Sequence, residues 1–369
     1  MKRVSIIGAG VIGLVLAKEL SQMGIDTTVY ESKLCVSDNT AKASGIFSRE
    51  GISKIGVVWD GALVNTINGA VLHAGKESFS VETDGTKAYI LDRGIFADLC
   101  AKEAERAGAR IVLNKRLGRE DILAMRNEDG NILVGADGAV SSVASAVGFP
   151  PINEHILTYK AEYEGVSIAN MNKVELFFSN KIANRFFGWT VPYTSTKLEV
   201  GIGISSRSKK NSSSAFNEFM KTQYMRGLIG NARMTAGYAS MIPLQSRKKT
   251  VIGNVLLVGD AAGQVKATTG GGIIFGVSCA KIAARVINDH VKLGKPLSSY
   301  ETEWRKAHGL DLGLHSAIHG FYSSMGEERL AFIMKAARSM GFENFLGKYG
   351  DMDRPSLMIK RFFLRGISE

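Results

Sequence analysis

The order of apolar and polar positions near the N-terminus is that of a strand, a helix and a second strand. Residues 3–7 are a short run rich in β-branched side chains, and residues 11–23 are an apolar-rich segment of helical length. Gly24 follows this segment and is a suitable helix C-terminal cap. Residues 27–31 then form a second β-branched run. The pattern predicts a β-α-β unit with a glycine-rich turn after its first strand.

Two later apolar runs predict further strands of the same sheet. Residues 132–137 and 255–260 are buried-type runs that end in Gly-Ala-Asp and Gly-Asp. A helix to about residue 106 and a strand at 109–113 are expected between the N-terminal unit and these runs. Because parallel strands carry their carboxyl ends to one edge of a sheet, we expect one extended ligand at that edge.

In the middle of the chain the spacing of apolar side chains changes to an alternating pattern. Residues 150–241 are rich in β-branched and aromatic side chains at period two, as at 174–178 and 198–204. We therefore expect an α/β fold: a Rossmann-like nucleotide domain, split by an antiparallel β-sheet substrate domain and followed by a mainly helical C-terminal region. The expected boundaries are 1–149 with 242–299 for the discontinuous nucleotide domain, 150–241 for the substrate domain, and 300–369 for the C-terminal region.

The turn after the first strand reads Gly8-Ala-Gly10-Val-Ile-Gly13, the dinucleotide fingerprint in its expected strand-to-helix context. Gly8 permits the tight turn, Gly10 lets a pyrophosphate approach the backbone, and Gly13 lets the helix pack on the strand. Glu31 ends the second strand, where a carboxylate can accept hydrogen bonds from ribose hydroxyls. An acid at this place favours FAD or NAD over NADP.

Composition narrows the possible partners. The net charge of +11 is concentrated at 205–250 and in the tail from 354, which indicates either a solvated basic face or contact with an anionic membrane. Aromatic interleaving is absent from these stretches, so nucleic acid is not expected. Three scattered cysteines suit a reducing cytoplasm and predict neither a disulfide framework nor a metal site. No apolar stretch has the length of a transmembrane helix.

Three segments of the chain resemble the FAD-binding segments of flavoproteins with the p-hydroxybenzoate hydroxylase type fold. They are the fingerprint with Glu31, the Gly-Ala-Asp-Gly at 135–138, and Gly259-Asp260 followed by Thr-Gly-Gly-Gly-Ile. Within that group the runs 186–192, 200–203 and 264–273, and the late stretch 349–355, look like the geranylgeranyl reductase family, whose signature has the form Tyr-x-Trp-x-x-Pro. The chain is thus identified as similar to a family of FAD-dependent oxidoreductases.

The resemblance and the fingerprint together imply a set of site residues. FAD is expected to contact Gly8, Gly10, Ile12, Gly13, Glu31, Gly45, Arg93, Asp137, Asp260, Gly271, Gly272 and Ile273, and the substrate pocket is expected to include Phe187, Trp189 and Pro192. Phe187 stands where the family signature has Tyr. Many members carry a cysteine in the loop before Gly45, whereas this chain has Lys42-Ala43-Ser44.

The implied chemistry is reduction of C=C bonds in a polyprenyl, geranylgeranyl-type lipid or diphosphate, with hydride supplied by reduced FAD. No catalytic side chain is assigned, and the electron donor is either NADPH or a ferredoxin. The alternatives are a flavin monooxygenase of an aromatic or quinone-like substrate, an electron carrier, and an FAD-stabilised scaffold. The expected partners are an isoprenoid lipid and, in addition, an anionic membrane surface and a ferredoxin. The expected location is the cytoplasm, with peripheral contact to the membrane.

Overall fold

The computed structural model describes residues 2–39 and 44–365. Its first sheet has six strands in the order β15-β16-β9-β1-β2-β8. Five neighbouring strands are parallel and β15 joins antiparallel at one edge. Their bounds are β1 (Arg3–Ile7), β2 (Asp26–Tyr30), β8 (Arg110–Val112), β9 (Asn131–Gly135), β15 (Val251–Ile252) and β16 (Val255–Leu257).

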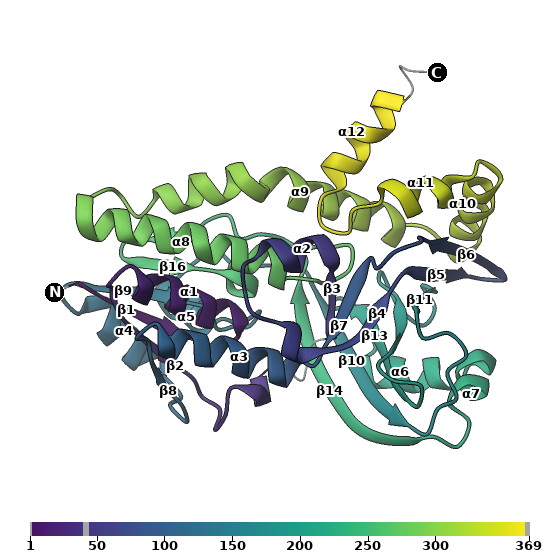
Figure 1. Cartoon of the computed structure of the whole chain (residues 1–369), viewed down its shortest axis with the longest axis horizontal. Helices are drawn as coiled ribbons and strands as arrows, with labels where there is room; N and C mark the ends of the chain where they lie inside the picture. The colour runs from purple at the N-terminus through teal and green to yellow at the C-terminus, as the bar shows by residue number, and fades with distance from the viewer. Residues whose placement is uncertain (1, 40–43, 366–369) are drawn as a thin grey trace.

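Helices cover both faces of this sheet (Figure 1). One face is covered by α1 (Val11–Gln22), α3 (Arg93–Arg106) and α8 (Ile273–Leu293), and the other by α4 (Arg119–Asn127) and α5 (Ser142–Val147). Alternate positions of β9 divide between the two layers, because Ile132 and Val134 pack with α1 and Leu133 packs with α5. Burial on both sides explains why the strands are almost continuously apolar.

The second sheet has seven strands in the order β14-β10-β13-β12-β11-β5-β6. Their bounds are β5 (Gly69–Ala74), β6 (Glu77–Glu82), β10 (His155–Glu164), β11 (Lys173–Phe178), β12 (Gly188–Pro192), β13 (Lys197–Ser205) and β14 (Arg233–Pro243). Helices α6 (Ser212–Met220) and α7 (Gln223–Ile229) contribute Phe216, Phe219 and Met225 to a core with β10 and β13.

This sheet corrects the expectation that segment 150–241 alone builds an antiparallel sheet. β5 and β6, from the part of the chain assigned to the nucleotide domain, extend the sheet, and β5 pairs parallel to β11. β14 also runs past residue 241 to Pro243. The pairing of β5 with β11 joins residues about a hundred positions apart, and such non-local pairing leaves no periodic signal in either segment. The fold class itself is confirmed, while the division into three domains stays a prediction.

A small third sheet and α2 connect the two larger sheets (Figure 1). Its strands, in the order β3-β7-β4, are β3 (Ile46–Ser48), β7 (Ala88–Leu91) and β4 (Leu63–Ile67). Helix α2 (Arg49–Lys54) follows β3 directly, and Ser48 caps it by accepting a hydrogen bond from the Gly51 N–H.

The C-terminal region is helical, as predicted. It consists of α9 (Ser299–Ser323), α10 (Glu327–Ser339), α11 (Phe342–Tyr349) and α12 (Pro355–Arg365). Helix α9 packs on α8, whereas α10 and α11 pack on β5 and β6, and α12 projects away from the rest of the molecule (Figure 1). Among the described residues, no helix combines the length and the apolar character that crossing a bilayer requires.

Candidate functional site

A cavity of about 1340 Å³ lies where the carboxyl edge of the first sheet meets the second sheet. Its lining includes the turn after β1, the residue after β2, the residues after β9 and β16, and the N-terminus of α8. The second sheet contributes side chains from β5, β6, β10, β11, β12 and β14. The structure thus brings the expected edge of the parallel sheet and the expected substrate sheet to one cavity.

The turn after β1 depends on close backbone packing. Gly8 has φ +108°, and a Cβ there would lie 2.4 Å from the Ala136 carbonyl oxygen. A Cβ on Gly13 would lie 2.1 Å from the Gly8 carbonyl oxygen, whereas one on Gly10 would meet nothing within 4 Å. Gly8, Gly10 and Ile12 line the cavity, and Gly13 lies behind them in the contact between helix and turn. The unobstructed backbone at Gly10 is the form that a pyrophosphate site requires.

Glu31 lies at the end of β2, lines the same cavity and is almost fully buried. Its Oε2 accepts a hydrogen bond from the Ala9 N–H at 2.9 Å, and its Oε1 accepts one from the Lys33 N–H at 2.9 Å. The carboxylate therefore ties the second strand to the glycine turn. Oε1 also accepts from Ser32 Oγ at 3.1 Å, so Oε2, with one of its two lone pairs used, retains capacity to accept from a further hydroxyl.

Asp260 and Arg93 face the same cavity from different elements. Asp260 lies in the 3-10 helix η3 (Gly259–Ala262), directly after β16, and Arg93 is the first residue of α3. The Arg93 guanidinium lies 5.3 Å from the Phe47 ring centroid and 5.9 Å from that of Phe96. Burial raises the pKa of Asp260 to about 6, and the charge of Arg93 opposes this shift. Burial also lowers the pKa of Arg93 from its usual value.

The raised pKa of Asp260 predicts a pH-dependent stability. In the unfolded chain this carboxyl titrates near 3.8, so the buried ionised form costs the folded protein stability at pH 7, and this cost disappears below about pH 4. We expect Asp260→Asn to raise the free energy of unfolding of the FAD-free protein more at pH 7 than at pH 4, by up to about 3 kcal/mol. Urea unfolding at the two pH values measures this difference. The exposed Asp129→Asn is the control, and equal effects of Asp260→Asn at both pH values would contradict the assignment.

Asp137 lines the cavity but is already engaged in local contacts. Its Oδ1 accepts a hydrogen bond from Ser141 Oγ at 2.6 Å and its Oδ2 accepts one from the Val143 N–H at 3.0 Å. Burial raises the pKa of Asp137, and these hydrogen bonds oppose the shift. The side chain therefore stabilises the start of α5 at the edge of the cavity.

The glycine loop at residues 270–272 leads into α8 and lines the cavity together with Ile273. A Cβ on Gly271 would lie 2.9 Å from Lys266 Cε, and one on Gly272 would lie 2.7 Å from Asp260 Oδ1. No side chain caps the N-terminus of this 21-residue helix. Its free N–H groups are a suitable place for the electron-rich edge or phosphate of a ligand.

Gly45 is the one expected cofactor residue, besides Gly13, that does not line the cavity. Its N–H donates to the Tyr193 hydroxyl at 3.3 Å, and a Cβ there would lie 2.0 Å from the Leu91 carbonyl oxygen. The neighbouring Ser44 and Ile46 do line the cavity. Lys42 and Ala43, at the place of the family's cysteine, lie outside the described residues.

Two of the three expected substrate residues line the cavity. Phe187 stacks on Phe186 with ring centroids 4.1 Å apart, and the Trp189 indole N–H donates to Glu199 Oε1 at 2.9 Å. Pro192 is buried at the end of β12 outside the lining, and its carbonyl accepts a hydrogen bond from Asn65. Pro192 is outside the lining because side chains alternate along β12, and Trp189 and Val191 occupy the face towards the cavity.

Sequence reasoning missed a buried ion pair in the second sheet. Lys160 Nζ on β10 lies 2.6 Å from Glu199 Oε2 on β13, with side chains 4% and 0% exposed. Glu199 also accepts hydrogen bonds from Ser44 and Trp189, and Lys160 lines the cavity. The available signal was Glu199 next to the apolar run of β13, since a charged side chain is rarely buried without a partner.

A second missed pair joins the glycine loop to the C-terminal region. Lys266 Nζ lies 2.6 Å from Asp353 Oδ1, with both side chains less than a tenth exposed.

No cluster of three or more His, Cys, Asp or Glu side chains among residues 2–39 and 44–365 is arranged to hold a metal ion.

Comparison with known proteins agrees with this geometry. Residues 1–312 match the family described as FAD binding domain, so the chain belongs to that family. The expected cofactor FAD is thereby confirmed, and the protein is an FAD-dependent oxidoreductase.

Three sequence relatives cover nearly all of the chain. An uncharacterized protein of Methanocaldococcus jannaschii is 25% identical, with 97% of this chain and 94% of that protein aligned. The digeranylgeranylglycerophospholipid reductase of the same organism is 26% identical over 90% of each chain. The reductase of that name from Methanothrix thermoacetophila is 26% identical over 91% of each chain.

Solved structures share the fold. A geranylgeranyl bacteriochlorophyll reductase-like protein of Thermoplasma acidophilum superposes with a TM-score of 0.79 at 17% identity, covering 90% of each chain. The p-nitrophenol 4-monooxygenase of Pseudomonas putida superposes with a TM-score of 0.70 at 16% identity, covering 98% of each chain. The fold thus occurs in a reductase-like protein and in a monooxygenase, and it does not distinguish the two reactions.

Proposed function

We propose that the protein is an FAD-dependent reductase that saturates C=C bonds of a polyprenyl, geranylgeranyl-type lipid or diphosphate, in isoprenoid or archaeal-type membrane lipid biosynthesis. The observation that carries the proposal is one continuous cavity with the glycine turn and Glu31 in one part and Phe187 and Trp189 in another. The names of the relatives support the substrate class, since two of them are digeranylgeranylglycerophospholipid reductases.

In this proposal the first sheet holds the cofactor. The turn at Gly10 and the uncapped N-terminus of α8 at Gly272 present backbone N–H groups, and a Cβ on Gly10 would meet nothing within 4 Å. The residues proposed to hold FAD are Gly8, Gly10, Ile12, Gly13, Glu31, Arg93, Asp137, Asp260, Gly271, Gly272 and Ile273, and Gly45 acts by shaping the neighbouring wall. When bound in its reduced form, FAD supplies the hydride.

The second sheet would hold the substrate and exclude water. An isolated alkene has no polar group to bind, so the polyprenyl chain must be held by apolar contacts at about 0.8 kcal/mol for each buried CH₂. Phe187, Trp189 and the neighbouring Leu176 provide such a wall. The electron donor would be NADPH or a ferredoxin, and titration of the oxidised protein with each donor distinguishes them.

The test supplies the reduced protein with a geranylgeranyl-bearing phospholipid and measures the product mass. We expect a gain of two hydrogens for each bond reduced, no reaction with the fully saturated phytanyl lipid, and a KM that rises as the polyprenyl chain is shortened. An aromatic substrate that gains oxygen, while the polyprenyl lipid stays unchanged, would instead support the monooxygenase alternative.

We further propose peripheral contact with an anionic membrane, which α12 would make. Helices α6 and α7 of the basic stretch 205–250 lie on the opposite side of the molecule from α12 (Figure 1), so this stretch is not part of the proposed contact. Helix α12 projects from the molecule and exposes Phe362 and Phe363, with 52% and 66% of their surface accessible, next to the exposed cations Lys360 and Arg361. Met358 of the same helix lines the cavity, so its base is next to the place where the lipid would bind.

This contact predicts salt-dependent flotation with liposomes. The protein should float with vesicles rich in anionic phospholipid at low salt and should largely lose this binding at high salt or with neutral vesicles. The double substitution Phe362→Ser with Phe363→Ser should weaken it several-fold. Leu34→Ser, at another exposed apolar side chain, is the control and should have no effect. Failure of the unchanged protein to bind anionic vesicles at low salt would overturn the proposal.

A further inference from the structure

The ion pair between Lys266 and Asp353 occupies a special place in the molecule. Lys266 follows η3 in the segment that leads to the glycine loop, and it lines the cavity. Asp353 comes from the loop between α11 and α12, about ninety residues later, and is not part of the cavity lining. The lysine of the pair is therefore a cavity residue, whereas the carboxylate that accepts from its ammonium lies outside the lining.

The backbone of Lys266 is hydrogen-bonded to the glycine loop at residues 270–272. Its backbone carbonyl accepts a hydrogen bond from the Gly270 N–H at 2.8 Å, and its own N–H donates to the Gly271 carbonyl at 3.2 Å. A Cβ on Gly271 would meet Lys266 Cε at 2.9 Å. The ammonium-bearing side chain thus lies directly against the glycine loop of the proposed FAD site.

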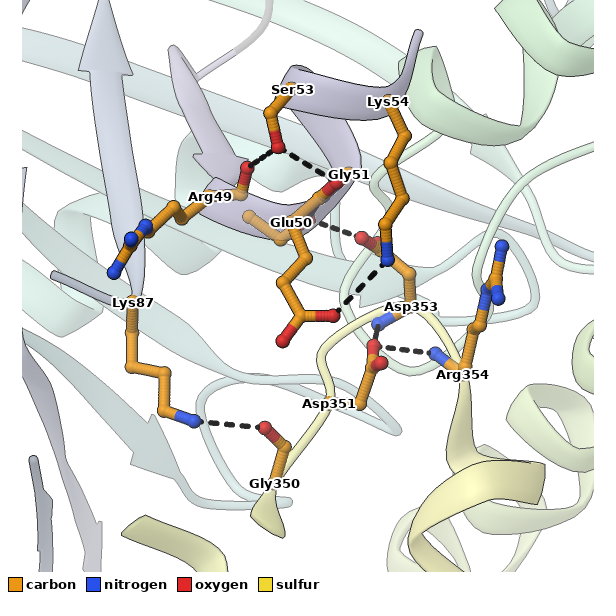
Figure 2. Close-up of polar contacts among 11 residues, drawn as sticks. Arg49, Glu50, Gly51, Ser53, Lys54, Lys87, Gly350, Asp351, Asp353 and Arg354 are labelled. Carbon is orange, nitrogen blue, oxygen red and sulfur yellow. Dashed lines mark hydrogen bonds and ion pairs between the residues drawn. The ribbon is translucent and has the colours of Figure 1, made fainter. Parts of the chain in front are cut away.

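The C-terminal loop that carries Asp353 is fixed from several sides. Lys266 Nζ also donates to the Met352 carbonyl at 3.2 Å, and Ser48 donates to Asp353 Oδ2. Figure 2 shows the loop beside α2, with Lys87 Nζ donating to the Gly350 carbonyl and Asp351 accepting the N–H groups of Asp353 and Arg354. A loop held in this way fixes the position of the carboxylate.

The Asp353 carboxyl is ionised at neutral pH. Burial alone would raise the pKa of Asp353, but the charge of Lys266 and the hydrogen bonds from Lys266 and Ser48 outweigh it and hold the pKa below its usual value. His315, whose Nε2 lies 3.2 Å from the Asp353 carbonyl oxygen, has its pKa lowered to about 4 by burial and by Lys266. His315 is therefore neutral at pH 7, and the charged groups at this place are those of the ion pair.

We propose that the Lys266 ammonium stabilises the reduced form of FAD, and that Asp353 is the positioning residue that holds this ammonium beside the glycine loop. The inference rests on FAD lying beside this loop, which is part of the proposed site, and does not depend on the identity of the substrate. It makes the C-terminal region a direct contributor to the electrostatics of the cofactor site.

The physical basis is the charge that reduction creates. Two-electron reduction of a flavin ring at neutral pH takes up two electrons and one proton and leaves one negative charge on the ring. A buried ammonium in the same cavity stabilises that charge, because Coulomb interactions are weakly screened there. Lys266 would therefore make the bound cofactor easier to reduce.

The test is the two-electron midpoint potential of the purified holoprotein, measured by reductive titration against dyes of known potential. We expect Lys266→Met to lower the potential, with about a tenfold loss in the affinity for reduced relative to oxidised FAD, or ~30 mV for a two-electron couple. Lys266→Arg keeps the charge and should restore a potential close to that of the unchanged protein. Lys281→Met, on α8 in an ion pair with Glu19 outside the cavity lining, is the matched control and should have no effect.

If Lys266→Met does not retain FAD, Asp353→Asn tests the same electrostatic effect on the potential. Asp353→Asn removes the negative charge while its amide oxygen can still accept from the ammonium, so the potential should rise. An unchanged potential in both Lys266→Met and Asp353→Asn, or an equal fall in Lys266→Met and Lys266→Arg, would overturn the proposal. These outcomes are independent of whether a polyprenyl lipid is reduced, so failure here is distinct from failure of the proposed function.

Discussion

Glu199→Gln is expected to lower the free energy of unfolding by about 3–5 kcal/mol, because it leaves the Lys160 ammonium buried without its counter-charge. Both side chains are almost fully buried, at 4% and 0% exposure, so water replaces the lost partner only poorly. The glutamine also offers one acceptor oxygen in place of two to the groups that now donate to Glu199, which include Ser44 and Trp189. Urea unfolding at neutral pH measures the loss.

The matched control is Glu50→Gln. Glu50 pairs with Lys54 on the surface of α2, with side chains 66% and 59% exposed, and such pairs contribute about 0–1 kcal/mol. A loss below about 1 kcal/mol in Glu199→Gln, similar to the control, would show that the pair is solvated in solution and would contradict its assignment as a buried ion pair.

Gly13→Ala is expected to abolish retention of FAD. The added methyl carbon would lie 2.1 Å from the Gly8 carbonyl oxygen and 3.2 Å from Ala136 Cβ, so the helix and the turn must separate. Separation displaces the N–H groups of the turn and the Ala9 N–H that Glu31 accepts, and with them the surface proposed to bind the pyrophosphate. The flavin content of the purified protein, measured by absorbance after denaturation, reports the effect.

The control is Gly313→Ala in the middle of α9, where an added Cβ meets nothing within 4 Å. That substitution should keep the flavin and stabilise the helix by about 0.5–1 kcal/mol. A full complement of flavin in folded Gly13→Ala would contradict the placement of FAD at this turn.

The nucleotide half of the site could be predicted because its signals are local. The fingerprint from Gly8 to Gly13 lies within one turn, and Glu31, Asp137 and Asp260 each follow a strand whose apolar run is visible in the sequence. Once the strands are parallel neighbours, their carboxyl ends must meet at one edge. The cavity lining includes all three carboxylates for this reason.

The rest of the site depends on contacts between distant segments. Lys160 and Glu199 meet only because β10 and β13 pair in one particular register, and Lys266 and Asp353 meet only because the C-terminal loop folds back onto α2. The contribution of β5 to the second sheet has the same origin. A charged residue in an apolar strand indicates that a partner exists, but it does not indicate which residue the partner is.

The central claim, that this FAD-dependent oxidoreductase reduces alkenes, is tested most directly by one anaerobic turnover. The holoprotein is reduced, mixed with a geranylgeranyl-bearing phospholipid in the absence of oxygen, and followed by flavin absorbance and product mass. The account predicts reoxidation of the flavin together with a product heavier by two hydrogens for each reduced bond. A flavin that stays reduced until oxygen is admitted, with no hydrogen gained by the lipid, would contradict it.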